Sequence, residues 1–265
     1  MKARIKFSKT GSMRFIGHLD VMRYFQKAFR RADINVSYSK GYSPHQLMSF
    51  ASPLGIGLSS DAEYLDIVFE EDYTFEAMTD RLNAVMNDEI RVKDFTILDD
   101  NAKPSMSILA ACDYLVALKP GKKSEFTDRE FLAENLSSFL AEEKIEVVKK
   151  TKKSEKLTDI RDNIYCMADN IFDFERYTGI KYGRLCIDEL CIPIIYMQLT
   201  SGSVINLKPE LVMEAFSKYS NVMFNPLDFQ IHRLEMYADA DCKKGEVHTR
   251  SSEIPIRLVP LYKSV

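Results

Sequence analysis

The stretches KARIKF at residues 2–7 and LDVMRYFQKAFRRA at residues 19–32 decide the fold of this chain. In the first stretch apolar residues occupy every second position, which is typical of a half-buried strand. In the second stretch apolar residues recur at steps of three and four, which is typical of an amphipathic helix. The helix positions expected to face the core are Leu19, Met22, Phe25, Phe29 and Ala32. The chain is therefore expected to begin with a strand followed by a helix.

The rest of the first hundred residues extends this pattern. A β-prone run at 35–38 can continue over 47–51, and the alternation at 63–70 predicts a further strand. A helix is expected at 75–87, and a last strand at 90–98. The order strand, helix, strand, strand, helix, strand predicts the βαββαβ arrangement called ferredoxin-like.

The second half of the chain repeats this order at the level of pattern. Strands and helices are expected at 108–118 (strand), 128–142 (helix), 145–150 with 159–168 (a hairpin with a basic loop), 192–199 (strand), 209–219 (helix) and 229–237 (strand). Sequence identity between the halves is not visible. The repeat is therefore inferred from periodicity alone.

These patterns predict an α+β protein with two ferredoxin-like (βαββαβ) subdomains in tandem. We place the subdomains at 1–100 and 106–238, with mainly antiparallel sheets and helices on one face, because a polar run near 99–106 separates them. The remainder, 239–265, forms a C-terminal extension. Its β-prone run at 254–261 is expected to add an edge strand.

Composition narrows the class of protein. A hydrophobic fraction of 46% and a charged fraction of 28% are typical of a soluble globular protein. No apolar run is long enough to cross a bilayer, and the N-terminus lacks the apolar core of a signal peptide. The five cysteines form no C-x-x-C pair, which disfavours zinc ribbons and iron–sulfur clusters. We expect a cytoplasmic protein with no membrane partner and no cofactor.

Basic charge is concentrated at the start of the chain. Residues 1–50 carry ten Lys and Arg and only two acids, Asp20 and Asp33. This segment therefore has a net charge of +8, whereas the whole chain has −3. Such segregation indicates a basic face for an anionic partner, and nucleic acid is the first candidate because basic clusters release its condensed counterions. An ordinary solvated surface is the alternative.

Three groups of residues are candidates for binding. The first lies where the loop enters the first helix and contains Arg14, His18 and Asp20, which could form an anion site or simply start the helix. The second is the polar face of that helix. The third is a turn whose side chains could stack on bases and pair with phosphate, or could simply hold a rigid loop. The second group comprises Arg23, Lys27, Arg30 and Arg31. The third group comprises Lys40, Tyr42 and His45.

Evidence for catalysis in the sequence is weak. His18, His45 and Asp20 are the only candidates for acid–base chemistry, and no nucleophile motif is present. No metal site is predicted, because His18, His45, Asp20 and Glu63 lack the H-x-x-x-H and H-x-x-E spacings that support one.

A long motif in the first quarter of the chain resembles the signature of bacterial radical-SAM-linked proteins. These contain a domain of unknown function that is a separate chain in some species and is fused to the C-terminus of a radical SAM protein in others. The motif comprises Phe7-Ser8-Lys9-x-Gly11, Arg14 to Arg23, Phe29 to Ala32, Tyr38-Ser39-x-Gly41 to His45, Ser49 to Leu54 and Glu63 to Asp66. This chain departs from the usual pattern at Gly17, Ser43 and Gln46. Any hydroxyl role for the residue before His18 is therefore in doubt.

The resemblance implies a partner and no particular activity. The chain lacks the three-cysteine motif of radical SAM enzymes, so it resembles the detached companion of one, of the cobalamin-binding type. Relatives are often encoded near RNA-processing and ribosomal genes. The leading hypothesis is an accessory module that binds RNA or presents substrate through the three groups of residues above. The alternatives are an RNA-modifying or RNA-processing enzyme using His18 and His45, and a pure interaction module that docks a radical SAM partner.

Overall fold

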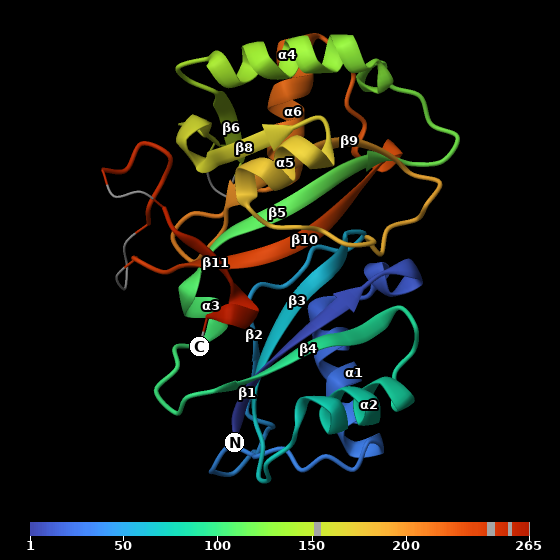
Figure 1. The fold of residues 1–265 in the computed structure, drawn as a ribbon, viewed down its shortest axis with the longest axis vertical. Helices are drawn as coiled ribbons and strands as arrows, with labels where there is room; N and C mark the ends of the chain where they lie inside the picture. Colours follow the sequence, from blue (N-terminus) through green and yellow to red (C-terminus); the bar gives the residue numbers. More distant parts are fainter. Residues whose placement is uncertain (151–154, 243–246, 254–255, 265) are drawn as a thin grey trace.

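The computed structural model describes residues 1–150, 155–242, 247–253 and 256–264 (Figure 1). These residues form one nine-stranded sheet in the order β4-β1-β3-β10-β5-β9-β8, with β2 paired to β3 and β11 paired to β10. A separate two-stranded sheet is made by β6 and β7. The fold is therefore α+β with a mainly antiparallel sheet, as the sequence predicts.

The N-terminal half contains the six elements expected from the sequence. They are β1 (Lys2–Lys9), α1 (His18–Arg31), β2 (Met48–Phe50), β3 (Ser59–Val68), α2 (Phe75–Val85) and β4 (Ile90–Leu98). Ala3, Ile5 and Phe7 of β1 are buried in one core with residues of α1 and α2. The alternating apolar residues of β1 and the apolar face of α1 thus pack in the same core.

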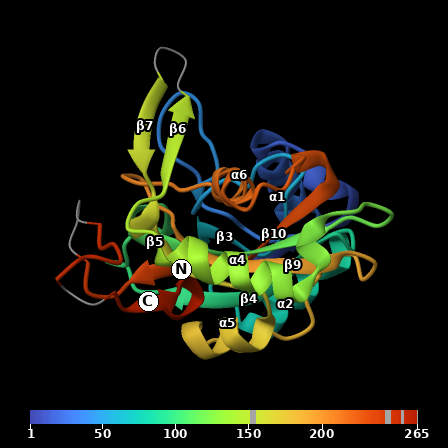
Figure 2. The ribbon, with the colours of Figure 1, turned by 90° about the horizontal axis from the view of Figure 1, so that it is seen from above.

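The C-terminal half contains more elements than the sequence predicts. They are α3 (Ser105–Ile108), β5 (Leu109–Leu118), α4 (Arg129–Ala141), β6 (Glu146–Lys150), β7 (Glu155–Asp159), β8 (Ile164–Ala168), α5 (Ile171–Thr178), β9 (Ile192–Thr200), α6 (Pro209–Ser220), β10 (Phe229–Asp239) and β11 (Leu258–Pro260). Phe139 of α4 and Phe216 of α6 pack with Val116 of β5. Phe174 of α5 packs with Leu115. Because adjacent strand residues face opposite sides, α5 covers the sheet face opposite to α6 (Figure 2).

The same strand order occurs in both halves. In the first half the order is β4-β1-β3-β2. In the second half the corresponding order is β10-β5-β9-β8. The halves are joined because β10 also pairs in parallel with β3, at His232 with Ser59 and Arg233 with Ser60. The strands thus form one continuous sheet, and the division into two ferredoxin-like subdomains stays a prediction.

Several details of the expected topology differ from the structure. The strand expected at 159–168 does not form a hairpin with 145–150: β6 pairs with β7, while β8 pairs with β9 in the main sheet. A 3-10 turn at Arg161–Asn163 occupies the first part of the expected strand, which is shortened to β8, and β7 before it was not expected. Helix α5 was not expected. The edge strand expected at 254–261 is the three-residue β11, and residues 254–255 and the basic loop tip at 151–154 lie outside the described residues.

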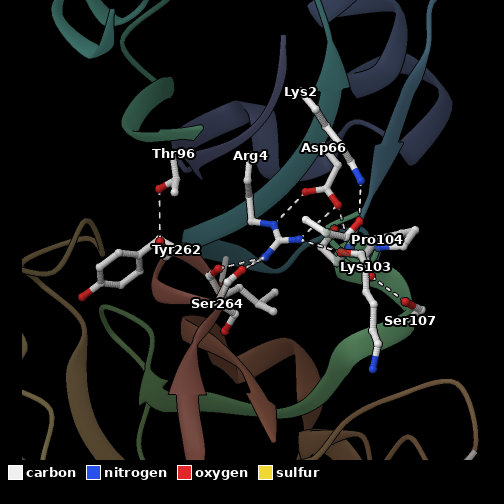
Figure 3. Close-up of polar contacts among 12 residues, drawn as sticks. Lys2, Arg4, Asp66, Thr96, Lys103, Pro104, Ser107, Tyr262 and Ser264 are labelled. Carbon is white, nitrogen blue, oxygen red and sulfur yellow. Dashed lines mark hydrogen bonds and ion pairs between the residues drawn. The ribbon is translucent and has the colours of Figure 1, made fainter. Parts of the chain in front are cut away.

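Arg4 binds the C-terminal segment by hydrogen bonds on the face of the sheet opposite α1 (Figure 3). Its side chain is fully buried, and its Nε donates to Asp66 Oδ1 at 2.7 Å. Its Nη1 donates to the carbonyl oxygens of Leu261 at 2.9 Å and Ser264 at 2.8 Å. Asp66 Oδ2 also accepts from the backbone N–H of Ser105 at 2.6 Å. Polar contacts thus join residues from both ends and the middle of the chain.

None of the helices in the described part of the chain has the length and apolar character needed to cross a membrane.

Candidate functional site

Glu89 accepts hydrogen bonds from the turn that precedes α1. Ser12 Oγ donates to Glu89 Oε2 at 2.6 Å, and the backbone N–H of Met13 donates to the same oxygen at 3.0 Å. Gly11 has φ +51°, and a Cβ at this position would contact the carboxylate of Glu89. The turn therefore favours glycine. Helix α1 then begins after Gly17, whose backbone is extended and which offers no side-chain cap.

His18 is half-buried at the first position of α1. Its ring contacts Phe50 edge-on, with 5.0 Å between ring centroids. Together with Lys9 and Glu63 it lines a cavity of about 10 Å³, which is large enough for roughly one water molecule. His18 thus lies between the start of α1 and a small interior cavity.

The charged groups beneath His18 are engaged with one another. Lys9 Nζ donates to the carbonyl oxygen of Ile16 at 2.9 Å, and Arg233 Nη1 pairs with Glu63 Oε1 at 3.0 Å. Burial lowers the pKa of Lys9 and raises the pKa of Glu63, and in each case the opposite charge nearby acts against burial. We call Lys9, Glu63 and Arg233 the buried charge cluster. Its members stabilise the interior and are not available to a large ligand.

The polar face of α1 is basic and exposed, as the sequence predicts. Arg23, Lys27, Arg30 and Arg31 are all exposed. Arg23 lies 3.4 Å from Asp20, whereas no ion pair formed within the described residues involves the other three. This face therefore presents Lys27, Arg30 and Arg31 without an ion-pair partner among the described residues.

The turn that contains Lys40, Tyr42 and His45 is closed by its own contacts. Tyr38 forms an isolated bridge with Gln46, and the backbone N–H of Ser39 donates to the carbonyl oxygen of His45 at 2.8 Å. Ser39 Oγ also lies 2.8 Å from His45 Nδ1. Lys40, Tyr42 and His45 are exposed. The turn thus holds these three side chains out into solvent.

The predicted site residues follow α1 from end to end and do not converge. Arg14, His18 and Asp20 lie at its start, whereas the turn with His45 comes after its end. A helix of 14 residues is about 21 Å long. In the described part of the chain no hydrogen bond, ion pair or ring contact joins His18 to His45. The two histidines considered for acid–base chemistry are therefore not in contact with each other.

The basic surface is smaller than the count of ten basic residues suggests. Arg4 and Lys9 are buried, and Lys6 Nζ pairs with Glu235 Oε2 at 2.6 Å. These three belong to β1, whose polar side is covered by β10 and the C-terminal segment. Their charge therefore stabilises the interior.

A family model described as "Uncharacterized protein conserved in bacteria (DUF2344)" matches residues 2–209. The chain belongs to this family. A search of curated proteins found no match. The fold and site described above are therefore those of a DUF2344 protein, a bacterial family of unknown function.

Several charged motif residues of this DUF2344 protein are buried, which was not expected from the sequence. Lys9 and Glu63 belong to the buried charge cluster, and Asp66 is the partner of Arg4. The signal in the sequence is that Glu63 and Asp66 lie within a stretch otherwise expected to be a strand, where a charged residue is either exposed or paired. Periodicity alone does not distinguish the two cases.

Apolar side chains surround the start of α1. Phe15, Leu19 and Ile56 are 60%, 59% and 68% exposed, so the expectation that Leu19 faces the core is wrong. Leu19 is the second residue of α1, and Val21 is buried instead. The guanidinium of Arg14 lies 4.8 Å from the Phe15 ring centroid, within the range of a cation–π contact.

A larger cavity, of about 440 Å³, lies on the α5 side of the sheet of this DUF2344 protein. Its walls are polar and include Tyr165, Tyr177, Gln198, Tyr237, Arg250 and Arg257. Behind Tyr237 lies the fully buried Asp113, whose Oδ2 accepts from the Tyr237 hydroxyl at 2.5 Å and also from Tyr182. Burial raises the pKa of Asp113 to about 7, although these hydrogen bonds lower it. None of these residues belongs to the three groups expected from the sequence to bind a ligand.

Proposed function

We propose that this protein is an accessory protein that binds RNA through α1 and acts together with a radical SAM protein in the cytoplasm. The observation that supports RNA binding is the exposed face of α1, on which Lys27, Arg30 and Arg31 have no carboxylate partner among the described residues. Such a face would gain affinity for a phosphate backbone by releasing condensed counterions.

Exposed rings at both ends of α1 favour RNA over other polyanions. Tyr42 in the turn and Phe15 before the helix are both solvent-exposed, and Arg14 lies over the Phe15 ring. Unpaired bases stack on aromatic rings and on guanidinium planes, so such groups bind single-stranded RNA. Basic and aromatic groups spread over the length of α1 suit a strand of several nucleotides better than a small molecule.

The radical SAM partner is proposed from the motif over residues 4–66. The five cysteines are scattered along the chain, and none is spaced as cluster ligands require. The iron–sulfur cluster would therefore belong to the partner, while this chain would hold the RNA or another substrate.

The RNA-binding proposal is tested by reversing charge on α1. In Lys27→Glu/Arg30→Glu, affinity for tRNA and rRNA fragments, measured by fluorescence anisotropy, should fall about tenfold or more at low salt. The slope of log affinity against log salt concentration should decrease in magnitude, because about two phosphate contacts are lost. The matched control is Lys123→Glu/Lys218→Glu, which makes the same change of charge at exposed positions of the C-terminal half.

The outcomes separate the proposals. Absent or salt-independent RNA binding by the wild-type protein would refute RNA binding, as would an equal loss of affinity in the control variant. Co-purification with a radical SAM protein at high salt and without RNA would support a pure interaction module instead. Chemical change in the RNA that is lost in His18→Ala or His45→Ala would indicate an enzyme.

A further inference from the structure

We propose that Asp239, Cys242 and His248 bind a transition-metal ion of the Zn²⁺ class. A carboxylate oxygen, a thiol sulfur and an imidazole nitrogen of these residues all lie within 4.8 Å of one another. Mixed oxygen, sulfur and nitrogen donors are the set that Zn²⁺ accepts, whereas Mg²⁺ and Ca²⁺ take oxygen donors. The inference is independent of RNA binding and of α1.

The donors are close to the separation that a bound ion requires. Zn²⁺ lies about 2.0–2.3 Å from its ligands, which places tetrahedral donors roughly 3.3–3.8 Å apart. His248 Nδ1 already lies 2.6 Å from Asp239 Oδ2, and their side chains are only 8% and 2% exposed. A small side-chain rotation would therefore be enough to replace the direct contact by contacts to an ion.

The backbone on both sides of the cluster is held by other elements. Asp239 ends β10 and pairs with Leu258 of β11. On the other side, the Tyr165 hydroxyl of β8 donates to the carbonyl oxygen of His248 at 2.9 Å, and the N–H of Arg250 donates to the carbonyl oxygen of Asp162 at 3.0 Å. The sheet thus anchors Asp239 and the segment that carries His248.

A hydrogen bond from a neighbouring residue orients the Asp239 carboxylate toward His248. Asp239 Oδ1 accepts from the backbone N–H of Asp241 at 3.1 Å, so the carboxylate is fixed while Oδ2 faces His248. Arg257 donates both of its hydrogen bonds to Asp241, at 3.0 Å each. In metal sites, hydrogen bonds of this kind orient the residues that coordinate the ion.

The metal site would adjoin the larger cavity. Tyr165, whose hydroxyl contacts the His248 backbone, lines that cavity, as does Thr249, the residue after His248. Three protein donors, the number found among the described residues, leave a coordination position for water or another ligand, as in catalytic zinc sites. The cavity is therefore where such a ligand would bind.

The test is a titration of the full-length, chelator-treated protein with Co²⁺, which reports thiolate coordination through its spectrum. A sulfur-to-cobalt charge-transfer band in the near ultraviolet is expected, together with visible bands of a four-coordinate ion. Zn²⁺ should remove both by competition. Cys242→Ser should lose the charge-transfer band, and His248→Ala should bind Co²⁺ about tenfold or more weakly.

The control is Cys186→Ser, which removes a cysteine outside the cluster and should leave the spectrum unchanged. An ordinary hydrogen bond between His248 and Asp239 is the competing explanation, and it predicts no Co²⁺ spectrum and no rise in melting temperature with Zn²⁺. Either result, or a charge-transfer band that survives in Cys242→Ser, would overturn the proposal. If the variants do not fold, X-ray absorption of the wild-type Zn²⁺ form decides, since it must show one sulfur ligand with nitrogen and oxygen.

Discussion

The buried guanidinium of Arg4 makes hydrogen bonds to Asp66 and to the carbonyl oxygens of Lys103, Leu261 and Ser264. A buried charge must replace its lost hydration by hydrogen bonds to protein groups, and Arg4 makes several such bonds. Taking one partner away leaves the rest of the charge buried and uncompensated. The stability of the molecule therefore depends on a few such residues much more than on its surface ion pairs.

Asp66→Ala should lower the free energy of unfolding by about 3–5 kcal/mol, since it leaves Arg4 buried without its carboxylate. Glu189→Ala is the matched control, because it removes the carboxylate of an exposed pair with Arg184, and it should cost no more than about 1 kcal/mol. Urea unfolding of the three proteins measures both values. Equal losses in the two variants would contradict the role assigned to Arg4.

Asp113 should make stability fall as pH rises. Its pKa in the folded protein is about 7, whereas its ordinary value is 3.8, so the folded state keeps a proton that the unfolded state has released. Each unit of difference corresponds to about 1.4 kcal/mol, and the contribution is full below pH 4 and is lost progressively up to pH 7.

The measurement for Asp113 is the free energy of unfolding between about pH 4 and 8. Asp113→Asn keeps an acceptor for the tyrosine hydroxyls but cannot ionise, so its stability should lack the decline seen in the wild type. Asp100→Asn, at an exposed position, should retain it. Parallel pH profiles for wild type and Asp113→Asn would show that Asp113 does not titrate in this range.

At the scale of elements, the helices differ in how their N-termini are capped. Asp128 begins α4 and its Oδ1 accepts from the backbone N–H groups of Glu130 at 3.1 Å and Phe131 at 3.2 Å. Gly17 begins α1 without a side chain, so the N–H groups of that helix end have no such partner. The first turn of α1 is therefore less strongly fixed than that of α4.

Asp128→Ala should lower the free energy of unfolding by about 1 kcal/mol, and Asp128→Ser should restore most of it. Gly17→Ser should instead raise it by a few tenths of a kcal/mol, because the new hydroxyl can cap α1 and a Cβ at this position would lie 3.9 Å from Asp20 Oδ2, its nearest neighbour. Chemical denaturation compares the variants. A loss in Gly17→Ser would mean that the backbone there does not tolerate a side chain.

Periodicity predicted most elements and failed where a short element carried a weak pattern. The strands β1, β3, β4, β5, β9 and β10 were expected because their alternating or apolar runs are long. Helix α5 has only eight residues, and its signals are local: Asn170 caps it and Gly179 ends it with φ +70°. The five-residue β7 is mostly exposed, so it carries no apolar pattern.

The site was predictable in part for the same reason. The basic face of α1 follows from helical spacing, and the structure bears out the exposure of Arg23, Lys27, Arg30 and Arg31. The burial of Arg4 and Lys9 could not be predicted, because the segments that cover β1 come from the far end of the chain. The cluster of Asp239, Cys242 and His248 is likewise formed by loop geometry, and its spacing matches no common metal-binding pattern.

At the scale of the whole molecule, two residue pairs of parallel sheet join the halves, and side chains add to them. Besides the Arg233 pair with Glu63, His232 Nε2 lies 3.0 Å from Asp61 Oδ2, and the Tyr64 hydroxyl donates to Glu235 at 2.5 Å. All these groups come from β3, β10 and adjacent residues. This polar seam thus adds to apolar packing, in which Ala51 and Ala62 join the core of the C-terminal half.

Arg233→Met should lower the free energy of unfolding by about 3–5 kcal/mol, because Glu63 is left buried without its ion-pair partner. Glu63→Met/Arg233→Met should be more stable than Arg233→Met, since it removes both members of the ion pair and leaves only Lys9 of the buried charge cluster. Urea unfolding followed by far-ultraviolet circular dichroism and by tyrosine fluorescence should give coincident transitions in the wild type. A double variant no more stable than the single one would show that the pair does not carry the seam.

The position of β10 in the middle of the sheet affects how the protein is made. Arg4 is separated by 257 residues from Leu261, one of its acceptors, and β10 is translated after every other long strand. While the chain is still on the ribosome, β3 and β5 therefore have open edges, and open edges invite aggregation. Ser59, Ser60, Asp61 and Glu63 give the β3 edge a hydrophilic character that water can satisfy during this interval. The β3 side chains that contact β10 in the finished protein thus also keep the edge of the nascent sheet hydrated until its central strand is made.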